Sequence, residues 1–294
     1  MKHIFELGDD VAYQAWKREK LAHYPSALAD LVVEISDPLA LTVQERGALL
    51  SRCAKSNMAL FCLSHPEKLR ENPLPALTAQ LGLREWDRNL GAGEEGLSAL
   101  TPGGSAYDPF AHYIPYRAAA IGWHTDGYYN PADHQVQSLC LYCERPAHEG
   151  GENALLDHEL VYMQLRDRHP EWLATLMEPD VMTIPARLDE QGQVARPERT
   201  GPVFSVTAQG ALHARFTNRR KSIRWRGDEA TQQAVEGLRQ LLQSSSYLFL
   251  GRLEAGWGLV SHNVLHTRNA FSDPADGPVR VLYRARFFDR LPAA

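Results

Sequence analysis

The most constraining feature of this chain is a series of short apolar runs, separated by turn residues, that begins near residue 112 and continues almost to the end. Runs of this length and composition, bounded by Gly, Pro, Asn or Asp, are typical of β-strands. Many short strands packed together favour a sandwich or jelly roll with its site in the mouth. The runs interpreted as strands are "VQSLCLYCE", "ALLDH", "VMTIPA", "PVFSV", "ALHARFT", "YLFLGRL", "WGLVSHNV" and "PVRVLYRARFF".

Helical patterns lie mainly before these runs. In "LTVQERGALLSRCAKSNMALF", Thr42 and Glu45 form a capping-box pattern, and apolar residues recur at helical spacing behind them. Two later segments, 158–178 and 228–244, are predicted to be helical inserts. No Pro/Gly/Ser-rich linker divides the chain. We therefore expect one domain over 1–294, with a mostly helical part over about 1–104 and a β core over about 105–290, so that the fold class is mainly β with flanking helices (α+β).

The bulk properties exclude several classes of protein. The chain has 294 residues, is 44% hydrophobic and 23% charged, and carries a net charge of −5. An acidic balance argues against electrostatic binding to nucleic acid. No apolar run is long enough to span a membrane, and the charged N-terminal segment lacks the apolar core of a signal peptide. A cytoplasmic location is the resulting expectation.

Four cysteines are too few for a disulfide framework in a chain of this length. Cys140 and Cys143 form a CxxC, which is found in redox and zinc sites. They lie in a strand-like run, and no second CxxC is present. We interpret them as structural thiols and keep a redox or zinc half-site as the alternative.

The segment "WHTDG", 123–127, carries the first candidate for chemistry. In an extended segment, residues i and i+2 project to the same face, so His124 and Asp126 can point together into a pocket. One imidazole and one carboxylate are two of the three ligands of the 2-His-1-carboxylate triad, which suits non-haem Fe(II). Such a pair is common by chance, and a third ligand is needed from elsewhere in the chain.

The best-placed third ligand is His266 in "GWGLVSHNVLHTRNAF", directly after an apolar strand. His262 lies four residues earlier, at the helical spacing of HExxH metal sites. That interpretation needs a helix, which Gly256 and Gly258 disfavour, so His262 is predicted to be structural or to support a ligand. His213 in "ALHARF" is a weaker rival.

Three arginines alternate along "PVRVLYRARFF": Arg280, Arg284 and Arg286. Alternate residues share one face of a strand, so all three are expected to point into the β core. Buried guanidinium groups are costly unless anions meet them, and arginine grips carboxylates through paired hydrogen bonds. A dicarboxylate cosubstrate would meet this need. An exposed basic edge strand is the alternative.

Together these segments resemble the TauD/TfdA family of Fe(II)/2-oxoglutarate-dependent oxygenases, within the clavaminate-synthase-like group. The resemblance covers roughly residues 105 to 290 and lies in four motifs: "WHTDG", "GGENALLD", "NVLHTRNAF" and "RVLYRARF". It implies a double-stranded β-helix (jelly-roll) core. The metal ligands that it implies are His124, Asp126 and His266.

The same resemblance assigns the cosubstrate contacts. Arg280 would anchor 2-oxoglutarate, and Arg284 would help to hold the cosubstrate or an anionic substrate. Asn153 stands where the family often has a threonine that hydrogen-bonds the cosubstrate. Because Asp126 is a carboxylate rather than a small residue, hydroxylation or a related oxidation is implied rather than halogenation.

The implied function is that of a dioxygenase with Fe(II) and 2-oxoglutarate as cofactors. It would oxidise an unactivated C–H bond of a small, carboxylate-bearing metabolite and release succinate and CO2. Its partners would be this substrate and O2, without nucleic acid or membrane; a homo-oligomer stays open. Two alternatives use the same His/Asp/His set, namely a zinc-dependent hydrolase and a non-catalytic cupin-like binding protein.

The substrate contacts are predicted from position alone. Tyr128, Tyr129 and Asn130 directly follow the His-x-Asp motif and would line the mouth of the pocket. Arg284 and Arg220 are the charged candidates; Arg220 belongs to the basic run "RFTNRRKSIRW". A solvated basic face is the alternative interpretation of that run.

Overall fold

The computed structural model describes residues 4–88, 92–93, 96–102, 114–189, 191–219 and 223–293. The chain divides into two compact units. The first unit consists of Met1–Tyr24, Gly122–Gln135 and Leu156–Leu248. The second unit consists of Pro25–Ile121, Val136–Leu155 and Phe249–Ala294. No helix in the described ranges has both the length and the apolar character needed to cross a membrane.

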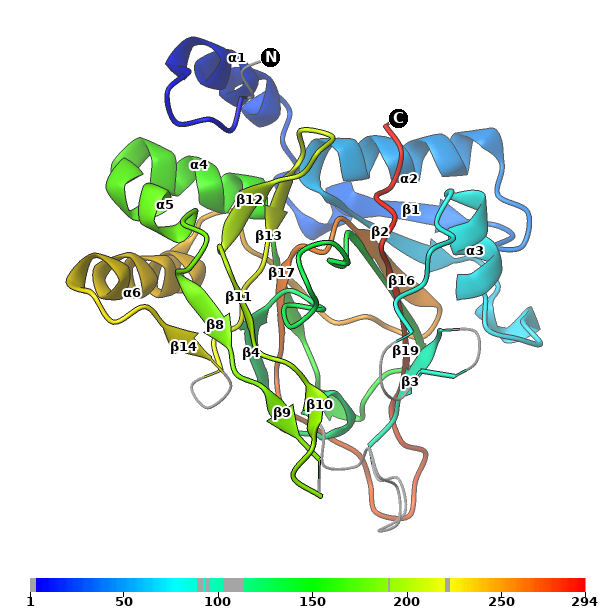
Figure 1. The fold of residues 1–294 in the computed structure, drawn as a ribbon. Helices are drawn as coiled ribbons and strands as arrows, with labels where there is room; N and C mark the ends of the chain where they lie inside the picture. The colour runs from blue at the N-terminus through cyan, green and yellow to red at the C-terminus, as the bar shows by residue number, and fades with distance from the viewer. Residues whose placement is uncertain are drawn as a thin grey trace. The chain divides into compact units, whose positions relative to one another are not determined.

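A six-stranded sheet is the centre of the second unit (Figure 1). Its first two strands in chain order run parallel to each other, and its other strand pairs are antiparallel. The helices expected in the first hundred residues are present, but three of the sheet's strands also come from there and were missed. From edge to edge the strands are β1 (Val32–Ile35), β2 (Met58–Leu63), β16 (Trp257–Ser261), β5 (Ser138–Arg145), β19 (Val281–Phe287) and β3 (Ser98–Leu100).

The sequence pattern of β2 explains why this strand was not predicted. β2 is buried almost throughout, so it shows no polar alternation, and it follows the helix α2 (Val43–Ser56) after a single residue. That residue, Asn57, ends α2 in the left-handed conformation (φ +58°), which asparagine tolerates better than most residues. The start of α2 is as expected, with the capping box of Thr42 and Glu45 fully formed.

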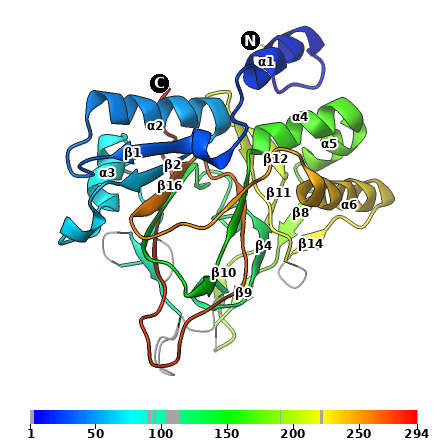
Figure 2. The ribbon, with the colours of Figure 1, turned by 180° about the vertical axis from the view of Figure 1, so that it is seen from behind.

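The hydrophobic core of the second unit lies between this sheet and the helices α2 and α3 (Leu74–Gln80). Figure 2 shows α2 lying along β1 and β2. Inward-facing residues of the central strands meet the apolar faces of both helices. Members include Leu49, Cys53, Phe61, Leu77, Cys140, Val260, Ala285 and Phe287. Burial of this apolar surface is the main source of stability for the unit.

A further sheet in the second unit places β7 (Asn153–Leu156) between β15 (Phe249–Gly251) and β17 (Leu265–Arg268). A two-stranded pair joins β6 (Glu149–Gly150) to β18 (Phe271–Ser272). Short 3-10 turns cover Leu28–Leu31, Pro66–Lys68 and Ile114–Tyr116. Two of the residues that the family resemblance singles out lie here, Asn153 in β7 and His266 in β17.

The first unit combines helices with short strands. α5 (Pro170–Leu176) and α6 (Glu229–Ser244) pack side by side (Figure 1), and Gly237 of α6 lies against the ring of Trp172. The predicted insert 158–178 forms two helices rather than one, because Pro170 interrupts it after α4 (His158–Arg168). The remaining elements are α1 (Asp10–Leu21), β4 (Ile121–His124, of which residues 122–124 belong to this unit), β8 (Met182–Ile184), β9 (Arg187–Leu188), β10 (Val194–Arg196), β11 (Arg199–Gly201), β12 (Phe204–Val206), β13 (Leu212–Ala214) and β14 (Arg224–Trp225).

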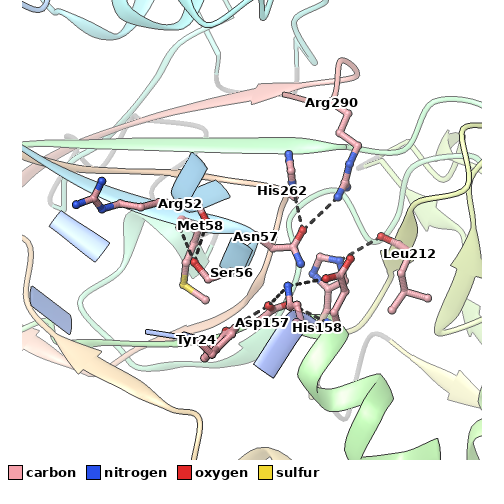
Figure 3. Close-up of polar contacts among 12 residues, drawn as sticks. Tyr24, Arg52, Ser56, Asn57, Met58, Asp157, His158, Leu212, His262 and Arg290 are labelled. Carbon is pink, nitrogen blue, oxygen red and sulfur yellow. Dashed lines mark hydrogen bonds and ion pairs between the residues drawn. The ribbon is translucent and has the colours of Figure 1, made fainter. Parts of the chain in front are cut away.

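A buried charge cluster anchors α1 in this unit. The Lys20 ammonium pairs with the carboxylates of Asp157 at 2.7 Å and Glu159 at 2.6 Å. The Tyr24 hydroxyl donates to Asp157 at 3.2 Å (Figure 3). Because all three charged groups are buried, removing Lys20 would leave both carboxylates without this cation.

We expect Gly258→Ala to destabilise the second unit. Gly258 lies in the middle of β16, and an added Cβ would collide with the Phe61 ring and with the backbone carbonyl of Leu141 on the neighbouring strand. Overpacking of this kind costs about 1–3 kcal/mol or more. Urea unfolding measures the loss. Gly47→Ala in α2 is the matched control, since an added Cβ there meets nothing within 4 Å; an equal effect of both substitutions would contradict the prediction.

Candidate metal and cosubstrate site

Asp126 and His124 are held by backbone pairing with a second segment of the first unit, residues 216–218. The Thr125 amide donates to the Phe216 carbonyl at 3.0 Å, and the Phe216 amide donates to the Thr125 hydroxyl at 3.1 Å. The Asn218 amide donates to the Trp123 carbonyl at 2.8 Å. Asp126 is 7% exposed, and His124 is half-buried. His124 thus ends a braced strand, as expected, whereas Asp126 lies in the turn that follows it.

The turn behind this motif has its own support. Gly127 has φ +66°, a conformation that glycine adopts freely, and its carbonyl accepts from the Asn130 amide at 2.8 Å. The buried Arg215 side chain donates from Nε to the Tyr128 carbonyl at 2.7 Å and from its other nitrogens to three further carbonyls, those of Met182, Gly201 and Arg199. Burial lowers the pKa of Arg215 to about 10. Arg215 therefore braces the loop that follows Asp126, a role that the sequence analysis missed.

Both candidate histidine ligands have one ring nitrogen occupied in the same way. Nδ1 of His124 lies 3.0 Å from the Gly122 carbonyl, and Nδ1 of His266, in β17, lies 2.9 Å from the Val264 carbonyl. A carbonyl oxygen can only accept, so Nδ1 carries the proton in each neutral ring and Nε2 keeps its lone pair. This tautomer is the one that metal-binding histidines need when Nε2 is the ligand.

His124, Asp126 and His266 make up a group that could hold a metal ion. One ligand atom from each residue can be chosen so that all three lie within 4.8 Å of one another. The donor set, two imidazole nitrogens and one carboxylate oxygen, fits a ferrous ion of the facial-triad type. No other such group is found among the described ranges.

The rival histidines have different surroundings. His262 follows β16 and its Nδ1 lies 2.8 Å from the Asn57 Oδ1, which also accepts from Arg290 at 3.1 Å (Figure 3). His262 lies between the strands β16 and β17, not on a helix. His262 and His266 therefore do not form a helical HExxH-type metal site. His213 lies in β13, paired with Ser205 of β12. Neither rival belongs to the metal-binding group.

Arg280 faces a polar cavity of the second unit. It is 4% exposed, its Nη1 has no hydrogen-bond partner among the described residues, and its guanidinium carbon lies 5.0 Å from the centre of the Phe271 ring. Burial holds the pKa of Arg280 below its usual value, although Cys143 and Asp273 oppose this. Asn153 and Cys143 share the wall of this small cavity with Arg280. A buried, incompletely bonded guanidinium in a cavity wall is suited to an anion.

Asn153 is less available than the sequence indicated. Its Nδ2 donates to the Thr267 carbonyl of β17 at 2.8 Å, and the Thr267 hydroxyl in turn accepts from the Ala154 amide at 3.1 Å. One amide proton of Asn153 is therefore used to brace the strand of His266. Only the second amide proton and the carbonyl oxygen remain for a ligand in the cavity.

The other two arginines of the alternating set are buried, which contradicts the exposed-edge alternative. Arg284 is 7% and Arg286 is 1% exposed, and β19 lies between β5 and β3. Arg284 and Arg286 share one face of β19, as predicted, because the alternating residues Ala285 and Phe287 belong to the hydrophobic core on the other face. Arg286 forms an ion pair with Asp87 at 2.5 Å, so it has a structural role. An acidic partner from the first hundred residues was not foreseen.

The predicted substrate residues are only partly placed. Tyr128, Tyr129 and Asn130 follow Asp126 in the chain and are half-buried. The two tyrosine rings contact edge to face, with their centres 5.2 Å apart. Asn130 donates from Nδ2 to the His134 carbonyl at 3.1 Å. Arg220 lies outside the described residues.

The CxxC behaves as two separate buried thiols. Cys140 and Cys143 lie three residues apart in β5, so they point to opposite faces; Cys140 belongs to the hydrophobic core and Cys143 to the cavity wall. Both are unpaired in disulfides, and burial raises the pKa of Cys143 to about 12. A reactive thiol needs a lowered pKa, so the redox alternative is not supported.

Comparison with known proteins agrees with this picture. Residues 91–286 match the model of the family described as "Taurine catabolism dioxygenase TauD, TfdA family". A uridine-5'-phosphate dioxygenase from Amycolatopsis sp is 29% identical over 55% of this chain and 60% of its own length, so the match spans less than two thirds of that relative. A second enzyme of that name, from Streptomyces sp, is 29% identical over 65% of this chain and 69% of its own.

Solved structures share the fold. The non-heme iron oxygenase OrfP, in complex with Fe and alpha-ketoglutaric acid, superposes with a TM-score of 0.60 over 98% of this chain and 90% of its own, at 18% identity. The expected jelly-roll core is thereby confirmed, and the expected dioxygenase class, iron and 2-oxoglutarate are confirmed at the level of the family. The chain belongs to the TauD/TfdA family of Fe(II)/2-oxoglutarate-dependent dioxygenases.

Proposed function

We propose that this chain oxidises an unactivated C–H bond of a small anionic metabolite, with Fe(II) and 2-oxoglutarate, and releases succinate and CO2. The observation that carries the proposal is the grouping of His124, Asp126 and His266, in which Nδ1 of each histidine bonds a backbone carbonyl. Three protein ligands on one face of an octahedron leave three positions for cosubstrate and O2.

The protein's own residues have distinct tasks in this proposal. His124, Asp126 and His266 would hold the iron, which supplies the dioxygen chemistry when bound. Arg280 would bind the far carboxylate of 2-oxoglutarate through its buried guanidinium. Asn153 would hydrogen-bond the cosubstrate with its remaining amide proton, and Arg284 would add positive charge on the same face of β19. Burial of these groups strengthens their electrostatic interactions and excludes water from the reaction.

The substrate is proposed to be anionic. Tyr128, Tyr129 and Asn130 would contact it beside Asp126. A carboxylate was the anion expected from the sequence. The two curated relatives bear the name of a phosphate-containing substrate, uridine 5'-phosphate, and this extends the proposal to phosphate monoesters. The family match does not support the zinc hydrolase or the non-catalytic binding protein.

We expect His124→Ala and Asp126→Ala each to weaken metal binding by roughly 100-fold or more, since losing even a group that only supports a ligand costs about 10–100-fold. Calorimetric titration with Mn(II) measures the affinity, and succinate formation with Fe(II), 2-oxoglutarate and O2 measures the activity, which should vanish. His213→Asn is the matched control and should bind the metal like the wild type. Unchanged Mn(II) affinity in the ligand variants would overturn the assignment, and zinc-dependent activity indifferent to 2-oxoglutarate would favour the hydrolase.

We expect Arg280→Gln to raise the KM for 2-oxoglutarate by about 10–100-fold, because a charge-assisted hydrogen bond contributes about 1.5–3 kcal/mol. The measurement is succinate formation against 2-oxoglutarate concentration. Arg145→Gln is the control: Arg145 is exposed and lies opposite Val281, one residue from Arg280. A KM that changes equally in both variants, or in neither, would show that Arg280 is not the anchor.

A further inference from the structure

We propose that Arg196, Arg219 and the Tyr128 hydroxyl form a subsite for a phosphate monoester group, with the Tyr129 ring as its wall. All four residues belong to the first unit, and Tyr128 lies two residues beyond Asp126. The inference deepens the proposed function and rests on it, because it assigns the phosphate to the substrate of the same dioxygenase. Arg196 and Arg219 were not among the residues predicted from the sequence.

The first observation is a like-charge pair in a hairpin. Arg187 of β9 and Arg196 of β10 lie directly opposite each other in the antiparallel register. Like charges at directly opposed positions destabilise a strand pair. A bound anion next to the hairpin would relieve this repulsion. Because Arg187 faces Arg196, its charge adds to the positive potential around Arg196.

Arg196 is positioned for such an anion. Its Nη2 donates to the Pro185 carbonyl at 2.8 Å, and its guanidinium carbon lies 5.2 Å from the centre of the Tyr129 ring, so two contacts hold the group in place. Its Nε is buried and has no hydrogen-bond partner in the part of the chain that the structure describes. A buried donor without an acceptor costs free energy, which a ligand oxygen would recover. Burial also holds the pKa of Arg196 below its usual value, and the nearby Arg187 and Arg219 add to that effect.

Arg219 and Tyr128 supply the other side of the subsite. The Arg219 Nη1 lies 3.3 Å from the Tyr128 hydroxyl, and the Tyr128 ring contacts that of Tyr129. The Tyr128 carbonyl is fixed by Arg215, so the position of this side chain relative to the His-x-Asp motif is set by a buried brace. The Tyr128 hydroxyl can then donate its own proton to a ligand.

Two neighbouring arginines differ from Arg196 and Arg219 because they pair with carboxylates. Arg224 pairs with Glu198 at 3.0 Å, and Arg226 pairs with Asp180 and Asp228 at 2.8 and 2.5 Å. Within the described ranges, neither Arg196 nor Arg219 forms an ion pair with a carboxylate. The combined charge of Arg196 and Arg219 exceeds that of one carboxylate. A phosphate monoester, with nearly two negative charges and three acceptor oxygens, matches them better.

The test is equilibrium binding without turnover. The full chain, loaded with Mn(II) and 2-oxoglutarate under anaerobic conditions, is titrated calorimetrically with uridine 5'-monophosphate, uridine and inorganic phosphate. We expect the monophosphate to bind at least about 10-fold more tightly than uridine, and Arg196→Gln and Arg219→Gln each to remove about 10–100-fold of the monophosphate affinity. Uridine binding should not change, and inorganic phosphate binding should weaken in both variants.

Arg224→Gln is the matched control, an exposed arginine of the same unit, and should bind all three probes like the wild type. Because Arg219 is exposed, its substitution leaves the fold intact even if Arg196→Gln does not. The subsite is overturned if the wild type binds the monophosphate no better than uridine, or if Arg219→Gln matches the wild type. Succinate formation without substrate, measured separately, distinguishes this failure from failure of the proposed function: a persisting basal rate with no phosphate preference removes only the subsite.

Discussion

The interaction on which the candidate site depends is the hydrogen bond from each histidine Nδ1 to a carbonyl two residues earlier in its own segment. Each bond sets the tautomer and the ring orientation together, so that Nε2 is the atom offered to a metal. Because the acceptor is local backbone, the orientation follows once the segment is extended. The extended form of the His124 segment is secured in turn by its pairing with residues 216–218.

Buried arginines are the second recurring feature, and the structure gives them different functions. Arg215 and the two Nη atoms of Arg268 donate to backbone carbonyls, and burial lowers the pKa of each arginine to about 10. Arg286 is neutralised by Asp87. Arg280 keeps a nitrogen without a partner in a cavity wall. Arg280 differs from these three because it also lines a cavity, where its guanidinium can meet an anionic ligand.

Arg196, like Arg280, has a buried guanidinium nitrogen without a partner among the described residues, although it lies in a different element and unit. If both bind anions, the enzyme would hold the cosubstrate carboxylate and the substrate phosphate on separate guanidinium groups. Such separation would allow affinity for the substrate to change without affecting 2-oxoglutarate.

Local patterns in the sequence determined a great deal: the strands β5, β7 and β19, the capped helix α2, and the residue types of the facial triad, because period, capping and ligand chemistry are local properties. The inward direction of Arg284 and Arg286 also followed from simple alternation. Tertiary structure alone decided the rest. β2 has no alternation, the Asp87 partner of Arg286 is nearly two hundred residues away, and Arg196 faces Arg187 only through a hairpin register. These depend on which distant segments pack together, and side-chain pairing across such separations leaves no trace in a local pattern.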